Sequence, residues 1–208
     1  MRQIGLFGGS FDPVHLGHVA LARAALDGLG LDEVLWIPAG QPWQKVRQLA
    51  SSDDRAAMVE LAIAGEARFR LERCELRRAG PSYTLDTVRE LQQAMGMVVT
   101  GWVLLIGQDQ YAGLPSWRGW RELVQRVTLA IAHRPGVAPE PPAALRQVPH
   151  RVLAIPMPPM AVSSTEIRER AASGLGLDGM VPPGVASYIA SHGLYRLPEN
   201  PATGERKH

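Results

Sequence analysis

The chain has 208 residues, 46% of them hydrophobic and 20% charged, with a formal net charge of +2. A chain of this length buries a substantial core in one domain, and so small a net charge gives no reason to expect a nucleic-acid partner. No apolar run is long enough to span a bilayer, the first residues lack the pattern of a signal peptide, and Cys74 is the only cysteine, which excludes an intrachain disulfide. We therefore expect a cytoplasmic protein that does not bind a membrane.

Short apolar runs alternate with longer amphipathic ones, which predicts an α/β fold built on a parallel sheet. The predicted strands are 4–7, 33–38, 69–76, 102–107, 127–132 and 151–155. The predicted helices are 16–29, 53–64, 84–94, 117–125, 164–172 and 183–191. The continuously apolar run 102–107 is expected to be a central strand, buried on both faces. We expect a loop over 39–52 and a surface loop over 136–147 that is broken by one helical turn. We also expect one domain over 1–197 and a polar, disordered tail over 198–208.

The junction between the first strand and the first helix has the sequence Gly8-Gly9-Ser10-Phe11-Asp12-Pro13-Val14-His15-Leu16-Gly17-His18. Glycines let backbone N–H groups approach a ligand closely, and the N-terminus of the following helix offers unpaired N–H groups and the positive end of its dipole. His15 and His18 are three residues apart, so they share one helix face. Each can donate a hydrogen bond and carry a charge near neutral pH. The combination indicates a polyphosphate-binding site.

Other interpretations of this junction are open. The glycines are typical of an ordinary strand-to-helix turn. The dinucleotide-binding fingerprint is disfavoured, because the spacing G-x-G-x-x-G is missing and the second strand ends at Pro38 without an acidic residue to hold a ribose. The Walker lysine is missing as well. Asp12, His15 and His18 are metal-ligand types, but no fourth ligand is evident nearby.

Two later segments carry candidate binding residues. Ser163 and Glu166 have the spacing of a capping box, which alone predicts only the start of a helix. Arg168 in the same helix adds a fixed fork of donors for an anion. Gly107 and Asp109 follow the expected central strand, where glycine permits close approach and a carboxylate can accept from ribose hydroxyls. Capping a helix is the simpler role for Asp109.

Several motifs, taken together, resemble those of a known protein family. The run from Gly8 to His18 resembles the signature of nucleotidyltransferases with the histidine-x-glycine-histidine motif, and the chain from Ile4 to about Arg196 is similar to the bacterial nicotinate-nucleotide adenylyltransferase family. The shared segments include Pro81-Ser82-Tyr83-Thr84, Ile106-Gly107-Gln108-Asp109, Pro115-Ser116-Trp117, His133-Arg134-Pro135-Gly136 and Ser163-Ser164-Thr165-Glu166-Ile167-Arg168. Each segment alone is weak evidence, whereas all of them in this order are highly specific. The resemblance implies a Rossmann-like, doubly wound parallel sheet with helices on both faces, in a single domain with C-terminal helices.

The resemblance also implies a reaction and its residues. The adenylyl group of ATP is transferred to nicotinate mononucleotide, which yields nicotinate adenine dinucleotide and pyrophosphate for NAD biosynthesis. The implied catalytic residues are His15, His18 and Arg168. The implied ATP contacts are Gly8, Gly9, Ser10, Phe11, Gly17, Lys45, Gly107, Asp109, Ser163, Ser164 and Thr165. The implied contacts to nicotinate mononucleotide are Ser82, Tyr83, Thr84, Trp117 and Arg134, although Arg134 is as readily a surface cation and Trp117 alone would more often be core.

The expected partners are ATP and nicotinate mononucleotide, and the chain could be a monomer or a homo-oligomer. Mg²⁺ is expected to accompany ATP, held by phosphate oxygens and water rather than by a metal site of the protein. A nicotinate carboxylate at the start of the helix 84–94 would meet free backbone N–H groups, and an uncharged carboxamide would gain less there. Trp117 offers a flat surface for the electron-poor ring.

Two departures from the family pattern stand out. Many members have Pro-Pro-His-Lys after the second strand, whereas this chain has Pro42-Trp43-Gln44-Lys45, which lacks the histidine and keeps Lys45 to attract phosphate. Arg118 follows Trp117 where relatives often have an aromatic residue. The rival functions are the same transfer to nicotinamide mononucleotide or phosphopantetheine, nucleotide binding without turnover, and a metal-dependent hydrolase built on Asp12 and the two histidines.

Overall fold

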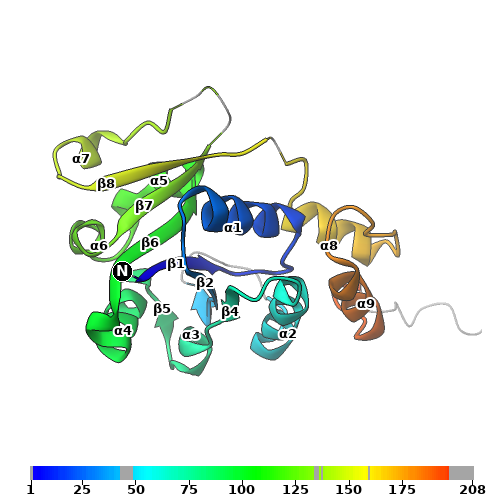
Figure 1. Cartoon of the computed structure of the whole chain (residues 1–208). Helices are drawn as coiled ribbons and strands as arrows, with labels where there is room; N and C mark the ends of the chain where they lie inside the picture. The colour runs from blue at the N-terminus through cyan, green and yellow to red at the C-terminus, as the bar shows by residue number, and fades with distance from the viewer. Residues whose placement is uncertain (1, 43–48, 134–135, 137, 159, 197–208) are drawn as a thin grey trace, which may run out of the picture.

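The protein is organised around a six-stranded parallel sheet with the strand order β4-β2-β1-β6-β7-β8 (Figure 1). The computed structural model describes residues 2–42, 49–133, 136, 138–158 and 160–196. The strands of the main sheet are β1 (Arg2–Gly9), β2 (Glu33–Pro38), β4 (Phe69–Leu71), β6 (Val99–Gly107), β7 (Thr128–His133) and β8 (Arg151–Pro156). A second, two-stranded sheet pairs β3 (Gln41–Pro42) with β5 (Pro81–Ser82) in parallel.

Helices cover both faces of the main sheet, as predicted (Figure 1). One hydrophobic cluster includes residues of α1 (Leu16–Gly28), α2 (Ser52–Ile63), α8 (Ser164–Ala172) and α9 (Pro183–Ser191). The other includes residues of α3 (Cys74–Arg77), α4 (Thr84–Met95), α5 (Gln108–Gly113), α6 (Trp120–Arg126) and α7 (Ala143–Arg146). Successive strand side chains point to opposite faces, so Leu6 of β1 packs in one cluster and Phe7 in the other. The prediction of a doubly wound α/β fold is confirmed.

Some predicted boundaries were wrong. The strand predicted over 69–76 ends at Leu71, because β4 pairs with β2 over only three residues, and a short helix begins at Cys74. The helix predicted over 117–125 begins at Trp120, since Gly119 before it has a left-handed backbone with φ 67°. In the loop predicted over 136–147, by contrast, the expected helical turn is present as α7. The predicted tail over 198–208 and part of the loop 39–52 lie outside the described residues.

The order in which strands are added to the main sheet reverses between β1 and β6, although all strands stay parallel. From β1 the chain builds outward through β2 to β4, and it then returns to β6 and builds through β7 to β8 on the other side. The carboxyl ends of these strands meet at one edge, where Gly9 is in register with Pro38 and Gly107 with Ala132. In open α/β sheets, ligands bind outside the carboxyl ends of the strands at such a switch point.

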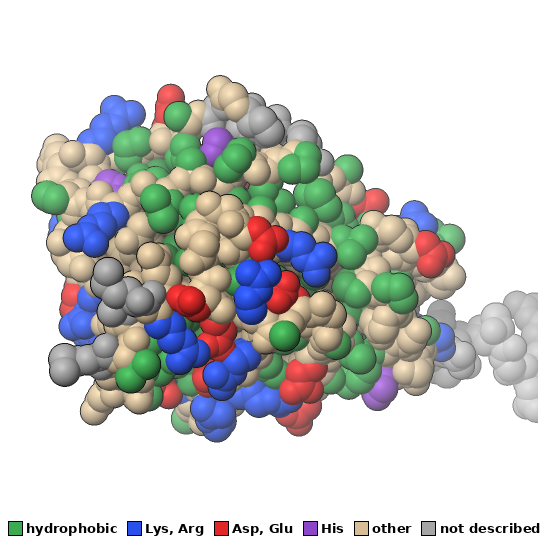
Figure 2. Space-filling model, in the orientation of Figure 1, with side chains coloured by type: hydrophobic (Ala, Val, Ile, Leu, Met, Phe, Trp, Pro, Cys, Tyr) green, Lys and Arg blue, Asp and Glu red, His purple; other side chains and the backbone are tan. Residues whose placement is uncertain are grey.

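Positive and negative side chains are interspersed on the face shown in Figure 2. On the surface of the protein, arginines pair with acidic side chains, such as Arg68 with Asp27 at 3.0 Å and Arg73 with Glu60 at 2.8 Å. Across the described part of the chain, no helix is long and apolar enough to cross a membrane.

Candidate active site

A cavity of about 470 Å³ opens at the switch point of the sheet. The carboxyl ends of β1 and β6 contribute Gly8, Gly9 and Gly107 to its wall, α1 contributes His18, β5 and α4 contribute Ser82 and Thr84, and Trp117 follows the short 3-10 helix η2 (Leu114–Ser116). Residues predicted to bind ATP and residues predicted to bind the mononucleotide therefore line one cavity.

The glycines of the first junction keep the backbone accessible. A Cβ built on Gly8 would meet no atom within 4 Å, so a ligand can approach the backbone there. A Cβ built on Gly17 would lie 3.1 Å from the His15 ring and 3.2 Å from Val162. The glycine between the two histidines therefore makes room for the His15 ring and for the segment that leads into α8.

The two histidines form a stacked pair at the start of α1. Their ring centroids are 3.6 Å apart with an interplanar angle of 29°. The backbone N–H of His15 donates to Nδ1 of His18 at 3.2 Å. Because Nδ1 accepts this bond, the ring hydrogen of a neutral His18 is on Nε2. The Phe11 ring packs edge-on against the His18 ring, with centroids 5.2 Å apart, and holds the plane of the imidazole.

The sequence leaves open whether these histidines are charged near neutral pH, and their burial in the structure decides it. Burial lowers the pKa of His15 to about 4. Burial, with a smaller contribution from the neighbouring His15, lowers the pKa of His18 well below its ordinary value. Both rings are therefore neutral at pH 7 in the free protein, and His18 offers the cavity a neutral hydrogen-bond donor.

The start of α8 contacts the first junction, as predicted. Ser163 caps the helix by accepting from the Glu166 N–H at 3.2 Å. The Ser164 hydroxyl donates to the Pro13 carbonyl at 3.0 Å. Arg168 donates from Nη1 to the backbone carbonyl of Asp12 at 2.8 Å. The two segments, about 150 residues apart in sequence, therefore lie side by side. Among the described residues, those of α8 stay outside the wall of the cavity itself.

Asp12 is part of a buried network rather than a ligand set. Its carboxylate is fully buried and accepts from the Ala50 N–H at 3.1 Å and from the Tyr195 hydroxyl at 2.8 Å. Within the described ranges, no group of three histidine, cysteine or acidic side chains is placed to hold a metal ion. Asp12 thus orders the loop between β1 and α1 through these bonds.

Arg55 of α2 joins three loops around the site and was missed by the sequence reasoning. Its guanidinium is almost fully buried and donates to the carbonyls of Ser10 at 2.9 Å, Ala50 at 3.1 Å and Gly40 at 3.2 Å. Burial lowers its pKa, and the neighbouring Asp12 carboxylate acts in the opposite direction. A signal existed, because Arg55 is three residues before a buried methionine on the apolar face of the helix.

The opposite side of the cavity holds the residues predicted to bind the pyridine ring. Ser82 is buried and accepts from the Gly40 N–H at 3.0 Å. Tyr83 begins α4 without a side-chain bond to the first N–H groups of that helix. The Arg118 guanidinium lies 4.7 Å from the centre of the Tyr83 ring. The arginine that replaces an aromatic residue therefore stacks on the neighbouring tyrosine, and half-buried Trp117 faces the cavity.

The remaining predicted residues differ in where the structure places them. Ser10 lines the cavity with the glycines. The Phe11 ring is buried in the core, so only its backbone is available to a ligand, and Asp109 is exposed on α5. The Thr165 hydroxyl is engaged by Arg168 Nη2 at 3.0 Å. Lys45 and Arg134 lie outside the described residues.

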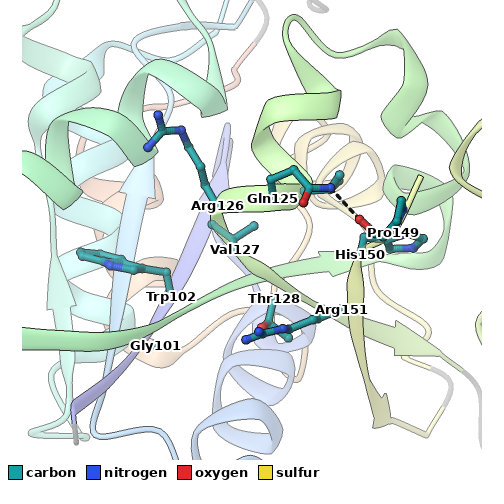
Figure 3. Close-up of a pocket in the computed structure, with 10 residues that line it drawn as sticks. Gly101, Trp102, Gln125, Arg126, Val127, Thr128, Pro149, His150 and Arg151 are labelled. Atoms are coloured by element: carbon teal, nitrogen blue, oxygen red, sulfur yellow. Dashed lines mark hydrogen bonds between the residues drawn. The ribbon is translucent and has the colours of Figure 1, made fainter.

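A second cavity, of about 390 Å³, lies at the other edge of the sheet, where β6, β7 and β8 begin (Figure 3). Its polar side chains bond within the protein. Gln125 donates to a backbone carbonyl, Arg126 pairs with Glu122 at 2.7 Å, and His150 contacts the Tyr111 hydroxyl at 2.9 Å. Since ligands of such sheets bind at the carboxyl ends of the strands, the first cavity is the candidate active site.

The fold and this site define a class of protein, the nucleotide-binding α/β transferases. A family model described as cytidylyltransferase-like matches residues 6–170. The solved structure titled Plasmodium falciparum nicotinic acid mononucleotide adenylyltransferase complexed with NaAD has the same fold, with a TM-score of 0.73 at 19% identity over 94% of this chain and 98% of that one.

Sequence relatives narrow the class. A chain from Methylibium petroleiphilum, named "Probable nicotinate-nucleotide adenylyltransferase", is 54% identical over 201 residues, which cover 95% of this chain and 94% of the relative. A chain of the same name from Bordetella petrii is 48% identical over 200 residues, which cover 94% of this chain and 100% of the relative. The chain therefore belongs to the nicotinate-nucleotide adenylyltransferase family, and the resemblance inferred from its motifs is confirmed.

Proposed function

We propose that this chain is an enzyme that transfers the adenylyl group of ATP to nicotinate mononucleotide, forming nicotinate adenine dinucleotide and releasing pyrophosphate. One observation carries the proposal: a glycine loop, the His18 donor and the aromatic side chain of Trp117 line one cavity at the switch point of the sheet. The names of the relatives and the NaAD bound by the structural neighbour support it.

The chemistry requires alignment and stabilisation of charge rather than a protein nucleophile. An ionised phosphate oxygen of the mononucleotide attacks the α-phosphorus of ATP, and the bond from that phosphorus to the bridging oxygen of the β-phosphate breaks. The nucleophile is already charged at neutral pH, so no general base is needed. Nε2–H of His18 donates to an α-phosphate oxygen as negative charge develops there, which is where a preorganised donor contributes most. His15, stacked on this ring just outside the cavity wall, supports its orientation, and a contact of His15 with the same phosphates stays part of the proposal.

The triphosphate is held from two sides. Gly8, Gly9 and Ser10, which line the cavity, are proposed to offer it their backbone N–H groups from one side, and Arg168, which α8 places against the Asp12 carbonyl just outside the cavity wall, is proposed to reach it from the other. Ser163, Ser164 and Thr165 stay proposed phosphate contacts at the start of that helix, and Lys45 is proposed to attract phosphate. Mg²⁺ enters with ATP, as part of the substrate, on phosphate oxygens and water.

The acceptor ring occupies the side of the cavity formed by Ser82, Thr84 and Trp117. The indole of Trp117 stacks on the pyridine ring, and the carboxylate of nicotinate meets the free N–H groups at the start of α4. An amide in place of the carboxylate carries no charge and gains less from the helix dipole. The geometry therefore favours the acid over the amide as acceptor.

The experiment is a measurement of pyrophosphate release by the purified chain with ATP, Mg²⁺ and either nicotinate or nicotinamide mononucleotide. We expect release with both nucleotides and a higher kcat/KM for the acid, with nicotinate adenine dinucleotide identified by chromatography. Phosphopantetheine serves as the acceptor control. Lack of release with every pyridine mononucleotide, despite ATP binding, would instead support a binding module without turnover.

A further inference from the structure

A buried carboxylate, which no step above uses, forms part of the cavity wall. Glu75 comes from α3, is only 7% exposed, and lines the cavity together with Ser82, Thr84 and Trp117. Burying an ionised carboxylate is costly unless other groups hydrogen-bond to it. Its partners therefore indicate what the carboxylate does.

The partners of Glu75 belong to the acceptor side of the site. The Thr87 hydroxyl donates to Oε1 of Glu75 at 2.7 Å, and the Ser82 hydroxyl also hydrogen-bonds to the carboxylate. Ser82 in turn accepts from the Gly40 N–H at 3.0 Å, which fixes the direction of its hydroxyl. The carboxylate thus connects the loop after β2 with β5 and the first turn of α4.

Burial, hydrogen bonds and neighbouring charges all act on the pKa of Glu75. Burial raises the pKa of Glu75, whereas the hydroxyls of Thr87 and Ser82 and the charge of Arg78 act in the opposite direction. Arg78 donates to Thr87 at 3.0 Å and pairs with Glu90 of α4, whose charge raises the pKa of Glu75 slightly. The Cys74 thiol beside Glu75 stays neutral, because burial raises its pKa to about 12.

Resting on the proposed function, we propose that Glu75 is a positioning residue for the acceptor nucleotide: it holds Ser82 and the start of α4 in the arrangement that receives the pyridine carboxylate. Thr84 lies between the two residues that Glu75 binds, so the first N–H groups of α4 depend on both contacts.

The first test compares wild type with Glu75→Gln. Glutamine keeps the shape but accepts hydrogen bonds at one oxygen only, so either Ser82 or Thr87 loses its acceptor. We expect the KM for nicotinate mononucleotide to rise about tenfold, the usual effect of one lost charge-assisted hydrogen bond, while the KM for ATP and kcat change less than about threefold. Equal increases in both KM values would contradict a role confined to the acceptor.

A second variant weakens the same contact, and a third serves as a control. Thr87→Val removes one donor to Glu75 without changing the cavity wall, and we expect a smaller rise in the KM for the mononucleotide. Glu33→Gln is the matched control: Glu33 is 5% exposed and pairs with Arg70 where β2 begins, at the edge of the sheet away from the site. It should leave both KM values unchanged. If Glu75→Gln fails to fold, the Thr87→Val measurement decides.

A pH profile separates positioning from simple packing. Protonation of Glu75 removes an acceptor, so wild-type kcat/KM for the mononucleotide should fall on acidification relative to that of Glu75→Gln. Titration of the substrate phosphates is common to both enzymes and cancels in the ratio. A ratio that stays constant on acidification, down to the lowest pH at which both enzymes remain folded, would overturn the proposal.

Equilibrium binding keeps the two proposals apart. Calorimetric titration with nicotinate mononucleotide gives Kd for wild type and for Glu75→Gln without any turnover. A wild type that binds the nucleotide but releases no pyrophosphate refutes the proposed function alone. An active wild type whose Kd is unchanged by Glu75→Gln refutes the positioning role alone.

Discussion

Replacing His18 with asparagine tests the catalytic assignment most directly. The asparagine oxygen can take the place of Nδ1 and keep the bond from the His15 N–H, which is 3.2 Å long in the wild type. The donor at the Nε2 position is lost, because the shorter side chain does not reach it. We expect kcat to fall by about 10² to 10³, the usual cost of one missing transition-state donor. Stability should change by no more than about 1 kcal/mol, since the buried N–H keeps its acceptor.

Two further variants make this prediction quantitative. His18→Gln places an amide nitrogen near the Nε2 position and should recover part of kcat. His18→Ala leaves the His15 N–H without its acceptor and empties the space beside Phe11, so about 2 to 4 kcal/mol of stability should be lost in addition to activity.

The assay is pyrophosphate release at saturating substrates, with urea unfolding of each variant alongside. The reasoning would be refuted by a wild-type kcat for His18→Asn. It would also fail if wild-type kcat/KM fell with rising pH through about 6.5 and this limb vanished in His18→Asn, because that behaviour requires a charged His18 in the free enzyme.

Three further predictions follow from the same geometry. Trp117→Ala should raise the KM for nicotinate mononucleotide by about three- to tenfold, because the stacking contact is lost. An unchanged KM would show that Trp117 has only a packing role. Arg55→Met leaves three loop carbonyls and Asp12 without their cationic partner and should cost about 3 to 5 kcal/mol in urea unfolding; a loss as small as that of the exposed control Arg73→Met would contradict this. For His15 the pKa falls from 6.5 unfolded to about 4 folded, so its stabilising contribution is complete above pH 6.5 and is lost as the pH falls towards 4, by roughly 3 kcal/mol. Between pH 4 and 7.5, the free energy of unfolding should rise less steeply with pH in His15→Gln than in wild type. An equal pH dependence of the two proteins would contradict a buried, neutral His15 ring.

Local signals in the sequence were enough for the elements whose ends depend on near neighbours. The helices 164–172 and 183–191 were predicted with the bounds that the structure has, since a serine cap begins the first and a proline pair begins the second. The strand predicted over 69–76 was wrong because β4 leaves the sheet after Leu71, although β2 continues to Pro38, and the chain turns into α3 at Cys74.

The sequence by itself determined the family, the alternation of strands and helices, and the motif with its paired histidines, because each depends on spacing along the chain. Only the tertiary structure decided the protonation of those histidines, since burial sets the cost of charging them. Tertiary contacts also gave Arg55 and Glu75 their places: Arg55 bonds to carbonyls up to 45 residues away, and Glu75 bonds to a hydroxyl 12 residues away. No local pattern specifies such partners, because they meet only when separate segments pack around the same cavity.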